Sequence, residues 1–160
     1  MNLLFPLFLS FVILIKASSA FAITSVVIEG EIVEAVTCKI NDNNPIDIDF
    51  GDAVAISKID GSHYAKPLTL VFTCSRDPEG TVTVTINGSG APFDAMALET
   101  NIKELGIRLT RDGSVITLGA PMAVNYPNPV VLMTAPIKQF GVTLLPGSFV
   151  AFSTAVVNYL

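Results

Sequence analysis

The C-terminal stretch, residues 147–160, most constrains the fold of this chain. It contains no charged residue, and β-branched or aromatic side chains recur along it. With a period of two, apolar side chains fall on both faces, which is typical of a strand buried on both sides. The exposed edge of such a strand is a template for aggregation, so we expect another strand to pair with it.

The two faces of this stretch differ little in polarity. One consists of Gly147, Phe149, Ala151, Ser153, Ala155, Val157 and Tyr159. The other consists of Ser148, Val150, Phe152, Thr154, Val156, Asn158 and Leu160. Because large apolar side chains occur on both, the sequence leaves open which face packs inward.

Residues 1–22 have the pattern of a secretory signal peptide. Residues 3–15 are almost entirely apolar, and residues 20–22 are Ala-Phe-Ala, an A-x-A cleavage signal. The apolar run is too short for an ordinary membrane span, although an uncleaved anchor is the alternative. We expect cleavage after Ala22, with Ala20 as the alternative position.

Charge and cysteine content exclude several classes of function. The formal net charge of −5 at pH 7 argues against nucleic-acid binding. Cys38 and Cys74 are the two cysteines of an exported chain, which predicts one disulfide. The bridge would close a loop of about 36 residues and contribute about 4 kcal/mol in the loop-entropy model. Two thiols and one histidine cannot form a closed tetrahedral metal site.

The rest of the chain consists of short segments separated by turn residues. Alternating polarity predicts strands at residues 24–32, 46–50, 68–74, 82–86, 105–110, 115–118, 130–135 and 140–145. Residues 112–113, Asp-Gly, predict a hairpin turn. Residues 92–103 favour a short helix, and residues 121–129 a Pro-rich connection. This spacing predicts an all-β sandwich.

Residues that could support chemistry are few. His63 is the one histidine, and its neighbours Asp60 and Ser62 fit a turn better than a catalytic triad. The acidic residues of segment 42–52 lack the bidentate glutamate of a calcium loop, and we interpret them as solvent-facing. We therefore expect no enzyme, no cofactor, no metal site and no small-molecule substrate.

Four features together resemble a subunit of a chaperone–usher fimbria (pilus), of the type 1 or P pilus kind and a minor or adaptor subunit. They are the alternating segment 24–32 with Gly30, the spacing of Cys38 and Cys74, the hairpin that follows Leu105–Leu109, and the pairing of Gly147 with the penultimate Tyr159. The resemblance covers residues 23–160.

The resemblance implies an incomplete immunoglobulin-like β-sandwich that lacks its last strand, with an N-terminal donor-strand extension. The implied division is residues 1–22 as signal peptide, 23–32 as extension and 33–160 as pilin domain. The donor residues would be Val26, Ile28, Gly30 and Ile32. Gly30 would lie where the receiving groove leaves no room for a side chain.

The resemblance also implies partners and a location. A periplasmic chaperone and an outer-membrane usher would recognise the terminal strand through Gly147, Phe149, Ala151, Ala155, Val157 and Tyr159. The chain would be exported through the periplasm to a cell-surface fimbria, would bind neighbouring pilus subunits and would contribute to cell adhesion. The alternative is a carbohydrate- or host-binding module that uses residues 60–64 or 121–129, which the absence of Trp disfavours.

Overall fold

The computed structural model describes residues 24–32 and 34–159, and the expected signal peptide lies outside them. The chain divides into two units, Met1–Val33 and Glu34–Leu160. In the first, residues 24–32 are exposed and form no regular secondary structure, so the strand predicted there is absent. Within the described ranges, no helix is long and apolar enough to cross a membrane.

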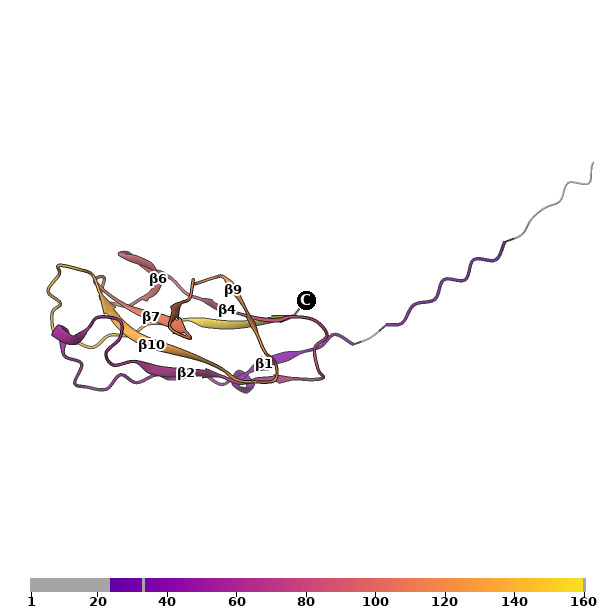
Figure 1. Ribbon diagram of the computed structural model, residues 1–160, viewed down its shortest axis with the longest axis horizontal. Coiled ribbons are helices and arrows are strands. Elements are labelled where there is room, and N and C mark those ends of the chain that lie inside the picture. The colour runs from indigo at the N-terminus through magenta and orange to yellow at the C-terminus, as the bar shows by residue number, and fades with distance from the viewer. Residues whose placement is uncertain (1–23, 33, 160) are drawn as a thin grey trace, which may run out of the picture. The chain divides into compact units, whose positions relative to one another are not determined.

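The second unit is built from antiparallel strands in three sheets (Figure 1). The largest contains β2 (Lys66–Leu70), β10 (Val130–Lys138), β7 (Leu105–Arg111), β6 (Asp94–Glu99) and β5 (Gly90–Ala91), with β8 (Ser114–Val115) paired to β7. The second contains β11 (Thr154–Tyr159), β4 (Val82–Asn87) and β9 (Pro121–Val124). A two-stranded sheet joins β1 (Cys38–Ile40) to β3 (Phe72–Cys74). Two 3-10 turns, η1 (Asn41–Asn43) and η2 (Ile56–Lys58), complete these elements.

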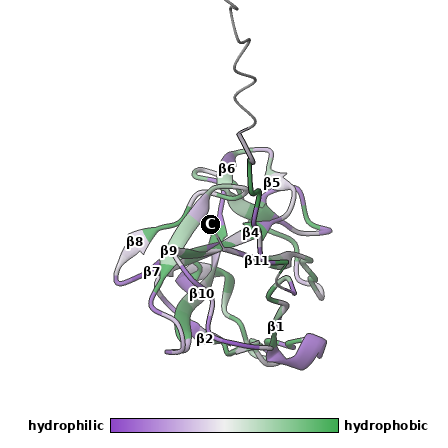
Figure 2. Cartoon of the chain, turned by 90° about the vertical axis from the view of Figure 1, so that its right-hand side faces the viewer, coloured by the Kyte–Doolittle hydropathy of each residue, from purple (hydrophilic) through white to green (hydrophobic). Residues whose placement is uncertain are grey.

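The two larger sheets share one hydrophobic core, which makes the unit a sandwich. Strands of both sheets carry hydrophobic residues (Figure 2). The core residues of the larger sheet are Leu68, Leu70, Leu98, Ile107, Leu109, Val130 and Leu132. Those of the smaller sheet are Val82, Val84, Ile86 and Val124. The expected all-β sandwich is confirmed.

Local sequence signals explain several elements. Val82, Val84 and Ile86 are buried on one face of β4, as the alternation with threonine predicted. Asp112 and Gly113 both have positive φ, 51° and 80°, and connect β7 to β8 as the predicted hairpin. Cys38 lies opposite Cys74 in the β1–β3 pair and is bonded to it, which confirms the predicted disulfide.

Several local predictions in this unit were wrong. Within residues 92–103 the chain forms β6 rather than a helix, because pairing with β7 buries Ala97 and Leu98. Residues 140–145 form no strand, and Phe140 is fully exposed. Residues 121–129 are not only a connection, since Pro121–Val124 pairs as the edge strand β9.

Candidate functional site

Two segments of the second unit belong to no sheet along most of their length and lie on either side of a groove. They are residues 44–54, which follow η1, and residues 144–157, which lead into β11. Three neighbouring cavities of about 540, 590 and 540 Å³ follow both segments and share lining residues. We call this row of cavities the groove, and the two segments the 44–54 wall and the 144–157 wall.

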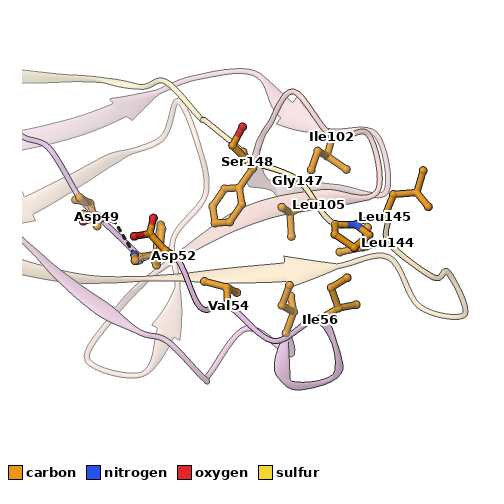
Figure 3. A pocket seen from close by; sticks show the side chains of 16 residues that line it. Asp49, Asp52, Val54, Ile56, Ile102, Leu105, Leu144, Leu145, Gly147 and Ser148 are labelled. Carbon is orange, nitrogen blue, oxygen red and sulfur yellow. Dashed lines mark hydrogen bonds between the residues drawn. The ribbon is translucent and has the colours of Figure 1, made fainter.

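The walls run in opposite directions along the groove. Residues 43–48 face 153–157 in one cavity, and residues 48–54 face 144–149 in another. A strand placed between them would therefore be antiparallel to one wall and parallel to the other. Figure 3 shows the end at which Val54, Leu105 and Leu144 meet.

The floor of the groove is the hydrophobic core itself. Leu68, Leu70 and Ile86 line one cavity, and Leu98, Ile107 and Leu109 line the next. At the end shown in Figure 3, the floor consists of Ile59, Ile102 and Leu105. An apolar strand that filled the groove would therefore complete the core.

The 144–157 wall settles which face of the terminal stretch packs inward. Phe149, Ala151, Ala155 and Val157 pack against the core. The opposite face is exposed, and its side chains retain 48%, 81% and 38% of their accessible surface at Val150, Phe152 and Val156. Gly147 and Ser153 line the groove as well. Most of the residues expected to recognise a chaperone therefore lie along the groove.

The predicted terminal strand is shorter than residues 147–160. Hydrogen-bonded pairing with β4 begins at Thr154. Before it, the Asn101 side chain takes the place of a strand: its Oδ1 accepts from Val150 N at 2.8 Å, and its Nδ2 donates to Ser148 O at 3.2 Å. The Asn101 backbone N–H also donates to Val150 O. Sequence reasoning gave Asn101 no role, because an asparagine in a polar loop carries no distinguishing signal.

The sequence predicted a short strand at residues 46–50 within the 44–54 wall, and this prediction was wrong. Ile48 and Phe50 do alternate inward against the core, but the segment joins no sheet. Asp49 Oδ1 accepts from Gly51 N at 2.7 Å, which bends the wall at a residue with φ of 83° (Figure 3). The Phe50 and Phe149 rings meet across the groove, with centroids 5.8 Å apart.

Tyr159 connects the last strand to the segment that precedes the first. Its Oη donates a hydrogen bond to Val36 O, next to the disulfide-bonded β1. This contact joins the end of β11 to the start of the unit. The role in chaperone recognition that the resemblance gives to Tyr159 stays a prediction.

The expected donor residues lie in the first unit. Val26, Ile28 and Ile32 are 78%, 91% and 100% exposed, and nothing lies within 4 Å of a Cβ built on Gly30. In an extended conformation these three aliphatic side chains would share one face, with Gly30 between Ile28 and Ile32. Their insertion into another subunit stays a prediction.

The single histidine belongs to a turn. Asp60 accepts from the backbone N–H groups of His63 and Ser62, and its second carboxylate oxygen lies 2.7 Å from His63 Nδ1. These bonds, the backbone ones first, lower the pKa of Asp60 from 3.8 to about 2. In the ranges 24–32 and 34–159, no group of three His, Cys, Asp or Glu residues is placed to hold a metal ion.

Comparisons with known proteins agree with this geometry. The family model for fimbrial protein matches residues 26–160. An uncharacterized fimbrial-like protein of Escherichia coli K12, YfcQ, is 29% identical over 159 residues, spanning 94% of this chain and 98% of the relative. A second, YfcR, is 29% identical over 119 residues, spanning 70% of this chain and 68% of the relative.

Solved structures show the same fold. The P pilus rod subunit PapA is 20% identical with a TM-score of 0.59, and the match covers 85% of this chain and all of PapA. The P pilus adaptor subunit PapF is 22% identical with a TM-score of 0.59, covering 77% and 95% of the two chains.

The chain belongs to the fimbrial protein family and has the fold of a chaperone–usher pilin. It is a structural subunit of a surface fimbria rather than an enzyme.

Proposed function

We propose that this subunit is polymerised by donor-strand exchange. In this mechanism, the groove receives an extended segment from one neighbouring subunit, and residues 23–32 enter the groove of the next. Val26, Ile28 and Ile32 would insert, and Gly30 would pass the shallowest point. The fimbria that results would contribute to cell adhesion.

The observation that carries the proposal is the groove itself, whose two walls join no sheet along most of their length and whose floor consists of apolar core side chains. Pairing an added strand with both walls would satisfy backbone groups and cover apolar side chains in one step. Main-chain bonds of this kind contribute about 1 kcal/mol net each. A subunit whose core is completed by its neighbour would dissociate slowly, which gives the fibre kinetic stability.

Before assembly, the same groove needs a temporary occupant. We propose that a periplasmic chaperone supplies it and contacts the 144–157 wall, and that an outer-membrane usher receives the complex. The inward position of Phe149, Ala151, Ala155 and Val157 supports this proposal, because an added strand would pack over these side chains.

The test is expression of the mature chain in the periplasm with and without a pilus chaperone. We expect a soluble one-to-one complex with the chaperone, and aggregates or slow-forming multimers without it. A soluble monomer that unfolds cooperatively with no partner would contradict the proposal, because its core would then be complete.

A further inference from the structure

The two walls of the groove differ in charge. The 44–54 wall and the turn before it carry Asp42, Asp47, Asp49 and Asp52, and residues 41–57 contain no lysine or arginine. All four carboxylates are exposed, and none forms an ion pair within the described part of the chain. The 144–157 wall has no charged residue. A strand in the groove would therefore have acidic neighbours on one side and neutral neighbours on the other.

Two of the carboxylates lie where they would meet that strand. Ile48 and Phe50 turn toward the core, so the alternating Asp47 and Asp49 lie on the outer side of the wall. Side chains on the same face of adjacent strands are about 4.5–5.5 Å apart at Cβ, and like charges at this distance repel. Asp47 and Asp49 would therefore favour an incoming strand whose solvent-facing residues are basic or neutral over one whose solvent-facing residues are acidic.

The chain's own extension is a poor match to this wall. Residues 24–32 contain Glu29 and Glu31 and no basic residue. If Val26, Ile28 and Ile32 insert, the two glutamates face outward beside Asp47 and Asp49. If the strand shifts by one residue, the glutamates enter the apolar groove, and burial of unpaired carboxylates costs more.

We infer that the groove receives the extension of a different subunit, one with lysine or arginine at alternate solvent-facing positions, rather than that of a second copy of this chain. The inference rests on the proposed strand exchange and names its partner. Insertion of one copy's extension into the groove of another copy would be slow, so the subunit would lie between different subunits in the fibre.

The experiment refolds the full mature chain at low salt with a labelled peptide of residues 24–32 or with its Glu29→Lys/Glu31→Lys variant. Peptide retention is followed by fluorescence anisotropy. We expect the lysine peptide to insert about 5- to 10-fold faster. The difference should shrink at 1 M salt, where the screening length falls to about 3 Å. The chain carries its own extension in both arms, so the comparison is matched.

Variants of the 44–54 wall test whether its carboxylates cause the difference in insertion rate. Asp47→Asn/Asp49→Asn should make the two peptides insert at the same rate, because the wall loses both negative charges. The turn should be kept, since asparagine at 49 retains the oxygen that accepts from Gly51 N. The control is Asp77→Asn/Glu79→Gln, which changes the net charge equally at exposed residues that do not line the groove. This control should preserve the difference between the peptides.

The outcomes separate the two proposals. Equal insertion at low salt, or faster insertion of the glutamate peptide, would overturn the charge inference and leave strand exchange standing. Retention of neither peptide would overturn both.

Discussion

At the scale of single residues, the groove depends on side chains that replace missing backbone pairs. Asn101 holds the 144–157 wall through Ser148 and Val150, where no strand does so. Asn41, which lies just before the 44–54 wall, acts similarly, since its Oδ1 accepts from Val71 N at 2.8 Å and its Nδ2 donates to Thr69 O at 3.3 Å. Each side-chain amide uses one N–H donor and its oxygen acceptor here, the pair of groups that a peptide unit offers.

Asn101→Ala should lower the free energy of unfolding of the strand-complemented chain by about 1–2 kcal/mol, since two hydrogen bonds to an exposed segment are lost. Equilibrium denaturation measures the change. Asn125→Ala is the matched control, because the Asn125 side chain makes no hydrogen bond within the described residues, and it should leave stability unchanged. An equal loss of stability in both variants would count against the role of Asn101 in holding the 144–157 wall.

The turn at Asp60–His63 should lose stability at low pH. Its pKa is lowered to about 2 in the folded chain, so its ionised form stabilises the turn above pH 4, and this contribution is lost as the pH falls through 2. NMR titration of the side-chain carboxyl carbon should give a midpoint near 2. In Asp60→Asn, the chemical shifts of Ser62 and His63 should change less between pH 4 and pH 2. A midpoint near the ordinary value of 3.8 would contradict the bond pattern.

At the scale of elements, alternation predicted the strands whose partners lie within the chain. β4 and β7 each bury one face against the core, and both were predicted from sequence. The same alternation in residues 46–50 failed to predict pairing, because periodicity specifies which face is buried and not whether a partner strand is present. β6 was mistaken for a helix because its burial comes from β7 and its own polarity pattern is irregular.

The extension is the element for which register matters most. Gly30→Leu should block transfer of residues 23–32 into another subunit's groove, because the added side chain meets the point of closest approach. Capture by the chaperone should be unchanged, since Gly30 has open space around it in its own chain. Pull-down with the chaperone and counts of assembled subunits measure the two effects.

Ser25→Leu is the control for this register, because residue 25 would face solvent in the inserted strand. It should assemble normally. If Gly30→Leu also assembles normally, the proposed register is wrong.

At the scale of the whole molecule, the sequence predicted the class of fold, the disulfide and an open edge along the terminal stretch, but not the segment that lies across the opening. Residues 147–160 were expected to present one long edge. Instead, pairing is confined to Thr154–Tyr159, and the unpaired part faces the 44–54 wall. The opening depends on the relative position of two segments about a hundred residues apart in sequence, which no local pattern encodes.

Hydrogen exchange tests the central claim most directly. In dilute, freshly refolded mature chain, before multimers form and without an added strand, the backbone amides of residues 46–50 and 151–153 should exchange rapidly, because no sheet includes them. Saturation with a donor peptide should slow their exchange on both walls, while β4 and β7 remain protected throughout. Protection of both segments before any strand is added, or its absence in the saturated complex, would contradict the account.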